Sequence, residues 1–262
     1  MDILFEDNHI IAVNKSVADI VQHDKTGDEP LDEKIKKYLK KKYNKPGNVF
    51  AGVVHRIDRP VSGVVLFART SKALERLNQM FQDKEVKKIY WAIVKNAPPK
   101  KNDTLVHYIV RNTKTNKSFA NEKESEGAKK AILHYSLIDQ SEHYQLLEVE
   151  LETGRHHQIR CQLSAIGCPI RGDLKYGFPR SNPDGGISLH ARMISFAHPV
   201  TKEPVTITAP TPDEKLWLYF QQRSVDQEKN KIKELLDEIK NIKSANAYQI
   251  NQYKKELGTL RE

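Results

Sequence analysis

The chain has 262 residues, 38% hydrophobic and 29% charged, which is typical of a soluble globular protein with a substantial core and an unusually charged surface. No apolar run approaches the roughly 20 residues that span a bilayer, and the first residues carry no signal-peptide pattern, so neither a membrane nor a secreted location is expected. The formal net charge of +9 favours a polyanionic partner such as RNA, although a basic surface without such a partner has the same charge.

Metal and cofactor chemistry lack a signal in the sequence. The two cysteines, Cys161 and Cys168, fit no usual zinc spacing and cannot form a disulfide framework. The chain has no glycine-rich phosphate loop and no His-Glu-Xaa-Xaa-His motif. We therefore expect no metal, no cofactor and a reducing, cytoplasmic environment.

The N-terminal segment predicts a hairpin followed by a helix. Residues 3–5 and 10–13 are short strand-like runs on either side of a polar break. Residues 31–43 place Ile35 and Leu39 on one helical face and many lysines on the other. Those lysines can contact an RNA backbone or simply face solvent, and the pattern does not decide between the two.

The central stretch, residues 53–67, has two apolar runs that predict strands, with a polar bend between them. Pro60 fixes its own φ and Gly63 can adopt a positive φ, so the bend should be tight. Asp58 then lies in a rigid turn beside cations that favour an ionised carboxylate, which can act as a nucleophile or base. Alternatively, it merely pairs with its two arginine neighbours, Arg56 and Arg59.

The middle of the chain predicts a helix and several strands. Thr70 or Ser71 can cap the helix. Residues 87–94 are rich in β-branched and aromatic residues and predict a strand that contains Tyr90, which in isolation suits a core position. Residues 98–127 are polar and predict strands broken by exposed loops. Two further strands are predicted at residues 131–137 and 144–151.

A cluster of donors marks the start of the next helix, which the apolar spacing predicts up to Gly167. Helix-start amides and cations together favour anions such as phosphate. The alternative is a basic helix start that holds nearby glutamates. The donors are Arg155, His157, Gln158 and Arg160.

The C-terminal part predicts a hairpin and then helices. Strands are expected at residues 188–196 and 205–210, and a short aromatic helix at 216–222. A long charged helix follows, and Tyr248, Tyr253, Leu257 and Leu260 can continue it. We expect two domains, a globular domain over 1–222 and a charged helical extension over 223–262.

Several motifs, taken in chain order, resemble those of RluA-type RNA pseudouridine synthases. Mild departures are Ile57, Val61 and His156, and Lys15 lacks the proline that commonly follows it. The motifs are His-Arg-Ile-Asp-Arg-Pro-Val-Ser-Gly at 55–63, Lys-Ile-Tyr-Trp-Ala-Ile-Val at 88–94, Gly-Arg-His-His-Gln-Ile-Arg at 154–160, Gly-Asp-Leu-Lys-Tyr-Gly at 172–177 and Leu-His-Ala at 189–191.

The resemblance implies site-specific isomerisation of uridine to pseudouridine in structured ribosomal or transfer RNA, without a cofactor. Asp58 would be the essential catalytic residue, Tyr90 would stack on the flipped target base, and Arg160 would lie at Asp58. The element order does not alternate as βαβ, so we expect an α+β fold. The family adds a central, mainly antiparallel mixed sheet with flanking helices, here followed by a helical tail. RNA contacts are expected from Arg56, Arg59, Arg155, His157 and Gln158.

Other functions and assemblies stay open at this point. The chain begins directly on the catalytic pattern, so we expect no extra N-terminal RNA-binding module. We also expect a monomer, and the alternative is self-association through a coiled-coil tail. An RNA-binding ribosome-assembly factor with weak or lost activity would share most of these features. A glycosidase usually needs a second catalytic carboxyl group about 5–10 Å away, whereas the motifs here pair the aspartate with arginine.

Overall fold

The computed structural model of the protein describes residues 1–24 and 26–259, and Leu260 lies outside them. Two compact units are present, Met1–Pro212 and Asp213–Glu262. Within the described residues, no helix combines the length and the apolar character needed to cross a membrane.

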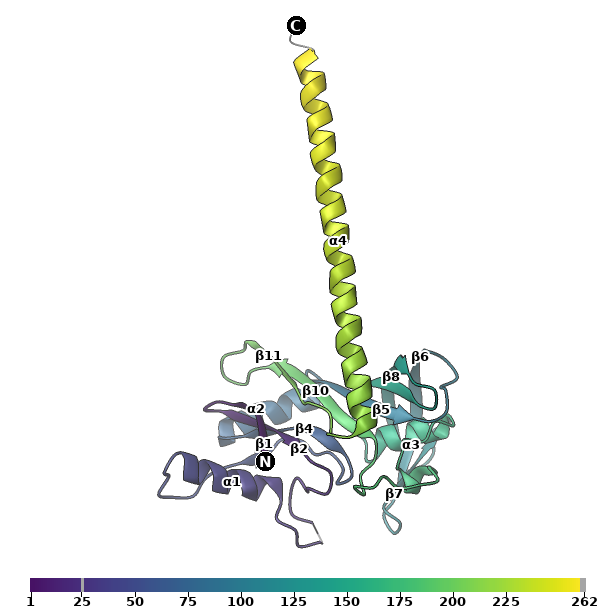
Figure 1. Cartoon of the computed structure of the whole chain (residues 1–262). Helices are drawn as coiled ribbons and strands as arrows, with labels where there is room; N and C mark the ends of the chain where they lie inside the picture. Colours follow the sequence, from purple (N-terminus) through teal and green to yellow (C-terminus); the bar gives the residue numbers. More distant parts are fainter. Residues whose placement is uncertain (25, 260–262) are drawn as a thin grey trace. The chain divides into compact units, whose positions relative to one another are not determined.

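The first unit is built on one sheet of 11 strands, in the order β1-β2-β4-β10-β5-β9-β8-β6-β7, with β3 paired to β4 and β11 paired to β10 (Figure 1). The pairing between β4 and β10 is parallel and the other described strand pairings are antiparallel, so the predicted α+β fold with a mainly antiparallel mixed sheet is confirmed. The strands are β1 (Asp2–Glu6), β2 (Ile10–Lys15), β3 (Gly52–Val53), β4 (Ser62–Ala68), β5 (Lys87–Val94), β6 (Asn102–Asn112), β7 (Lys117–Asn121), β8 (Lys129–Gln140), β9 (Gln145–Leu151), β10 (Leu189–Ala197) and β11 (Pro204–Thr208).

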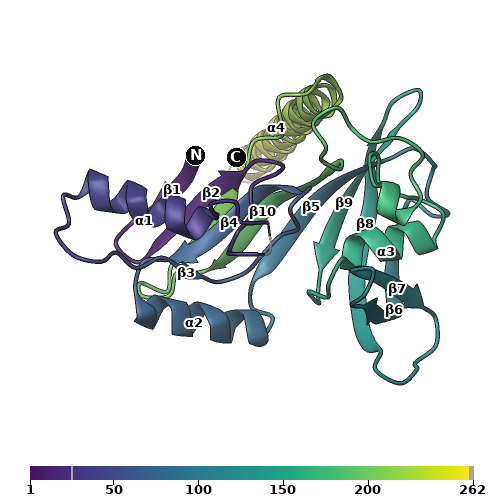
Figure 2. The same cartoon turned by 90° about the horizontal axis from the view of Figure 1, so that it is seen from below.

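Helices cover both faces of this sheet because its central strands are apolar on both sides. In β2, Ile11 and Val13 pack in one cluster with Ile35 of α1, while Ile10 packs in the opposite cluster with Leu77 of α2. Figure 2 shows α1 and α2 beside the β2–β4 half of the sheet and α3 beside β6 and β7. The helices are α1 (Leu31–Lys42), α2 (Ser71–Gln82), α3 (Gln158–Ala165), the short 3-10 helix η1 (Leu174–Tyr176) and α4 (Lys215–Thr259).

A glycine allows the close parallel approach of β4 and β10 directly after the Asp58 turn. Gly63 has a φ of +114°, and a Cβ atom at this position would lie 2.3 Å from the carbonyl oxygen of Ala191. The neighbour is backbone of a central strand and cannot move aside cheaply. The sequence predicted a positive φ for the turn, and the structure adds the steric reason why no side chain fits.

Gly63→Ala is therefore expected to lower the free energy of unfolding by about 3 kcal/mol, because the methyl group adds both a backbone strain and a clash. Urea unfolding monitored by circular dichroism measures this change. Gly47→Ala is the matched control, since a Cβ atom there meets nothing within 4 Å. Equal midpoints for the two variants would contradict the packing described for β4 and β10.

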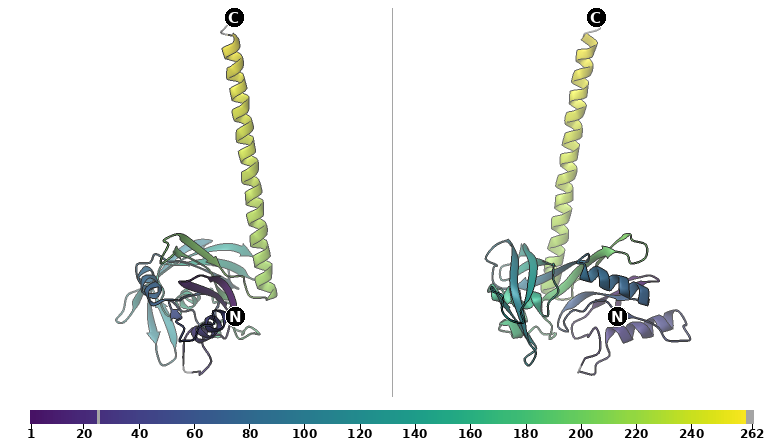
Figure 3. Two further views of the ribbon diagram at one scale, coloured as in Figure 1. Left: turned by 90° about the vertical axis from the view of Figure 1, so that its left-hand side faces the viewer. Right: turned by 180° about the vertical axis from the view of Figure 1, so that it is seen from behind.

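Two parts of the structure bear on the sequence-based expectations. The strands expected between the loops of residues 98–127 are present as β6 and β7. The segments expected as separate C-terminal helices form one uninterrupted helix, α4, drawn in Figure 3. The second unit begins at Asp213, ten residues before the expected boundary, because residues 216–222 are the first turns of α4.

Candidate active site

The turn that carries Asp58 is fixed by its own backbone carbonyls. The carbonyl of Asp58 accepts from the amide of Val61 at 3.0 Å, and that of Pro60 accepts from Ile187 at 2.9 Å. The ammonium of Lys15, at the end of β2, donates to the carbonyls of Arg59 and Val61 at 2.9 and 2.7 Å. Four consecutive carbonyls of the turn are thus satisfied, which holds the Asp58 side chain in place.

Lys15 is a supporting residue whose role the sequence did not indicate. Its side chain is only 1% exposed, and burial lowers the pKa of the ammonium to about 8. Three carbonyl acceptors, including that of Ser16, compensate for the loss of water around the charge. A lysine just before a predicted loop is an ordinary surface pattern, so only the fold identifies this role.

Arg160, in the first turn of α3, joins Asp58 to a second carboxylate. Its Nη1 donates to Asp58 Oδ2 at 2.9 Å, while Nε and Nη2 donate to the two oxygens of Asp173 at 2.7 and 2.9 Å. The side chains of Arg160 and Asp173 are 6% and 1% exposed, and that of Asp58 is 29% exposed. The bidentate pair with Asp173 fixes the guanidinium, so its third contact is aimed at Asp58.

His157 also faces Asp58, with 3.5 Å between Nε2 and Oδ2, longer than a normal hydrogen bond. Burial lowers the pKa of His157 to about 3, so the ring is neutral. The amide of Ser118 donates to the Tyr176 hydroxyl at 2.8 Å, and this hydroxyl lies 2.9 Å from His157 Nδ1. The Tyr176 hydroxyl thus joins the Ser118 amide to the His157 ring, and the histidine tautomer decides whether the hydroxyl or Nδ1 is the donor in the second contact.

The backbone at His157 is unusual in a way that supports this geometry. His157 caps α3 with a φ of +52°, in the left-handed region, which is uncommon for residues other than glycine. This backbone conformation places the His157 ring between Asp58 and Tyr176. Backbone outliers of this kind are frequent where a site requires one orientation of a side chain.

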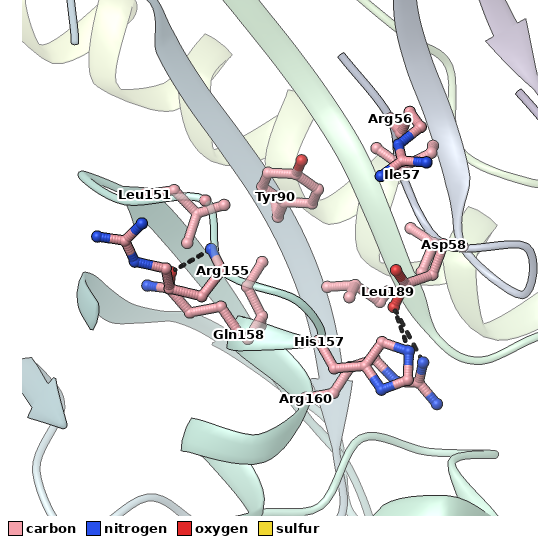
Figure 4. A pocket seen from close by; sticks show the side chains of 13 residues that line it. Arg56, Ile57, Asp58, Tyr90, Leu151, Arg155, His157, Gln158, Arg160 and Leu189 are labelled. Carbon is pink, nitrogen blue, oxygen red and sulfur yellow. Dashed lines mark hydrogen bonds and ion pairs between the residues drawn. The ribbon is translucent and has the colours of Figure 1, made fainter. Parts of the chain in front are cut away.

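Tyr90 lines the same pocket from β5, at the centre of the sheet. Figure 4 shows Tyr90 and Leu151 across the pocket from Asp58, which points towards Arg160 and His157. The pocket is open to solvent and has a cavity volume of about 110 Å³. Burial raises the pKa of Tyr90, and within the described residues its hydroxyl has no hydrogen-bond partner.

The predicted RNA contacts fall into two groups. Arg56 and Arg155 are exposed and line the pocket, whereas Arg59 is exposed but paired with Asp28 at 2.6 Å. His157 and Gln158 are buried. The Gln158 amide group accepts from the Arg155 amide and donates to the Ile132 carbonyl, so this side chain holds the loop before α3.

Asp173 and Tyr176 complete the site, although the sequence suggested only a structural role for their Gly-Asp-Leu-Lys-Tyr-Gly motif. Both act through a residue that touches Asp58, namely Arg160 and His157. No group of three or more His, Cys, Asp or Glu side chains that could hold a metal ion occurs within the described residues. The chemistry on offer is therefore that of one oriented, partly exposed carboxylate beside a cation and a neutral imidazole.

Comparison with known proteins identifies the family of this chain. A family model for RNA pseudouridylate synthase matches residues 9–165, and one described as a coiled-coil region of unknown function matches residues 222–262. An uncharacterized RNA pseudouridine synthase of Synechocystis is 32% identical over 85% of this chain and 70% of its own length.

Two further relatives carry more specific names. Ribosomal large subunit pseudouridine synthase D of Xylella fastidiosa is 33% identical over 82% of this chain and 67% of its own length. A tRNA pseudouridine synthase C of Pectobacterium carotovorum is 30% identical over 80% of this chain and 58% of its own length.

The fold is also similar to that of a pseudouridylate synthase domain of known structure. Human RNA pseudouridylate synthase domain containing 4 superposes with a TM-score of 0.70 at 22% identity, over 85% of this chain and 92% of that one. The family match covers more than half of the chain and includes Asp58, Tyr90 and Arg160. The chain therefore belongs to the RNA pseudouridylate synthase family and, as its RluA-type motifs predict, is an RNA pseudouridine synthase, an enzyme that isomerises uridine in RNA.

Proposed function

We propose that the protein isomerises defined uridines of structured ribosomal or transfer RNA in the cytoplasm, with Asp58 as the catalytic carboxylate. The observation that carries this proposal is the 2.9 Å hydrogen bond from the buried side chain of Arg160 to the carboxylate of Asp58, which lines an open pocket. The printed names of two relatives, one for the ribosomal large subunit and one for tRNA, support these RNA classes. The two unpaired, buried cysteines agree with a reducing compartment.

The reaction conserves atoms and needs no redox partner. The bond between N1 of uracil and C1′ of ribose breaks, the base turns within the pocket, and C5 bonds to C1′. The C5 proton leaves and N1 gains a proton, so the net change is an isomerisation. Asp58 acts on the sugar, either by adding to C1′ or by removing a ribose proton, and both routes require an ionised carboxylate held in one orientation by Arg160.

Tyr90 is assigned to the target base. A stacked uridine must be flipped out of the RNA, and an aromatic face in the pocket compensates for the lost stacking. Tyr90 lies across the pocket from Asp58 and offers a hydroxyl that has no protein partner among the described residues (Figure 4). All the residues that line the pocket belong to the unit Met1–Pro212, which we assign as the catalytic domain.

The Tyr176 hydroxyl is expected to matter for turnover through His157. Tyr176→Phe should lower the single-turnover rate about fivefold, since one lost neutral hydrogen bond corresponds to about 1 kcal/mol. RNA affinity should not change, because the hydroxyl is buried between Ser118 and His157. Tyr135→Phe is the matched control, since its hydroxyl donates to the Lys100 carbonyl at 3.2 Å, outside the pocket. Equal rates for both variants would remove Tyr176 from the site.

Cations around the pocket, and not those of α1, are assigned to the RNA backbone. Arg56, Arg111 and Lys175 line the wider groove that contains Asp58. In contrast, four of the six α1 lysines expected as a possible RNA face are paired with carboxylates of the protein. These pairs are Lys34 with Asp19, Lys36 with Asp32 and Glu33, Lys37 with Glu29, and Lys42 with Glu6.

Two triple variants with the same change of charge separate these surfaces. Changing Arg56, Arg111 and Lys175 to Gln should reduce the slope of log RNA affinity against log salt concentration by about one unit per lost phosphate contact. The same change at three α1 lysines should leave the slope nearly unchanged. Those lysines are Lys34, Lys36 and Lys37. The reverse result, measured by filter binding at several salt concentrations, would move the RNA path to α1.

The target uridine is found by mapping pseudouridine in total RNA from cells with and without this protein. The proposal expects one or a few positions of ribosomal or transfer RNA to lose the modification when the protein is removed. An unchanged map of both RNA classes would contradict the assigned substrate.

A further inference from the structure

One face of α4 exposes large apolar side chains along several helical turns. Ile232, Leu235, Ile239 and Ile242 are between 48% and 60% exposed. Soluble proteins rarely leave such a continuous apolar stripe uncovered, and when they do it marks an interaction surface. Leu236 and Val225, which are 53% and 38% exposed, extend it.

The spacing of the stripe is that of a coiled coil. In a heptad written abcdefg, Val225, Ile232 and Ile239 occupy a positions, and Leu235 and Ile242 occupy d positions; the first d position, Glu228, is charged. β-Branched residues at all three a positions, with leucine at one of the two apolar d positions, favour two strands. The next a position is Asn246, a residue that in this place fixes the register of a two-stranded coiled coil.

The charges beside the stripe distinguish parallel from antiparallel pairing. In a parallel pair, Glu238 at g meets Lys243 at e of the second copy, an attractive contact made twice, and Glu228 at d meets Glu228 of the second copy, a repulsive contact made once. In the antiparallel pair that overlaps the same apolar residues, Glu238 meets Glu238 of the second copy and Lys229 meets Lys243. Asn246 then faces Glu228. This arrangement has three like-charge contacts and lacks the two attractive Glu238–Lys243 contacts, so the charges favour the parallel pair.

We propose that α4 forms a parallel, two-stranded coiled coil with the α4 of a second copy of this chain, along the stripe Val225–Ile242. The family description for residues 222–262 names a coiled-coil region but neither the partner nor the direction. RNA suits this helix face poorly, because residues 225–243 contain five acidic and five basic side chains. The enzyme is thus a dimer, in place of the monomer expected from the sequence, and this holds whichever RNA it modifies.

The direction of the pair is tested by disulfide trapping in the full chain. Asn246→Cys should give a disulfide-linked dimer under mild oxidation, because equivalent a positions face one another only in a parallel pair. Asn230→Cys, at an outward f position, is the matched control and should stay unlinked. Cys161 and Cys168 are 3% and 1% exposed and will not interfere. Cross-linking only between mixed Glu228→Cys and Asn246→Cys chains would overturn the parallel pair in favour of an antiparallel one.

The assembly itself is tested by light scattering of the unmodified protein. We expect twice the mass of one chain for the wild type, and a single-chain mass for Ile239→Lys, which puts a charge in the seam. Asn241→Lys, at the outward c position, should stay dimeric. A wild type that is monomeric at the highest soluble concentration overturns the proposal. If the wild type is monomeric and Ile239→Lys binds RNA more weakly than the wild type does, the stripe contacts RNA instead.

Discussion

Asp58→Asn is expected to abolish pseudouridine formation, with a loss of turnover of roughly four orders of magnitude or more. Asparagine has nearly the same size as aspartate and its carbonyl can still accept from Arg160, so the fold and the RNA affinity should persist. What disappears is the anionic oxygen that adds to C1′ or removes a ribose proton. Single-turnover assays on a modified-site RNA, with RNA binding measured in parallel, separate these effects.

Asp28→Asn is the matched control for this change. Asp28 is an exposed carboxylate that pairs with Arg59, the residue next to Asp58, and it does not line the pocket. Its loss changes the local charge by the same amount and should leave turnover close to that of the wild type. If Asp58→Asn behaved like this control, Asp58 would be only a partner of its neighbouring cations.

Arg160→Lys and Arg160→Met are expected to have the second largest effects. Arginine contacts both Asp58 and Asp173 through three nitrogens, and a lysine keeps the charge but cannot reproduce this fork. Turnover of Arg160→Lys should fall by about two orders of magnitude or more, because Asp58 loses its orientation. Arg160→Met additionally leaves buried Asp173 without its cation, which should lower the free energy of unfolding by about 3–5 kcal/mol.

The lysine variant keeps this test informative if the methionine variant fails to fold. RNA affinity of Arg160→Lys should match the wild type, since Arg160 is buried and fully engaged by the two carboxylates. Combined with Asp58→Asn, it should be about as inactive as Asp58→Asn alone, because the residues act as a unit. Normal turnover with weakened RNA binding would instead make Arg160 a phosphate contact.

The residues of the proposed catalytic centre could be selected from sequence largely because they lie in contiguous motifs. Asp58, Tyr90 and Arg160 come from segments far apart in the chain, and the structure brings them around one pocket. Local patterns also predicted β5 and the α1 helix, whose apolar residues repeat with clear periods. The motif order, and not the composition, carried the functional prediction.

The supporting residues could not be found in this way, because their partners are distant in the chain. Lys15 binds the turn 44 residues further on, and a lysine gives no sequence signal that its ammonium is buried. Tyr176 contacts His157 through its hydroxyl. This contact depends on the left-handed backbone conformation of His157, which no local sequence pattern indicates. For α4, propensity signals of the aromatic and charged segments suggested separate helices, although nothing between them interrupts the backbone hydrogen bonds.

Release of tritium from RNA labelled at C5 of uridine tests the central claim most directly. Forming the bond between C5 and C1′ expels the C5 hydrogen, so purified wild-type protein should release tritium from its target RNA in step with pseudouridine formation. Asp58→Asn should release none above background while binding the same RNA. Release by the asparagine variant at the wild-type rate, or none from ribosomal and transfer RNA with the wild type, would contradict the assignment of Asp58 and of this substrate.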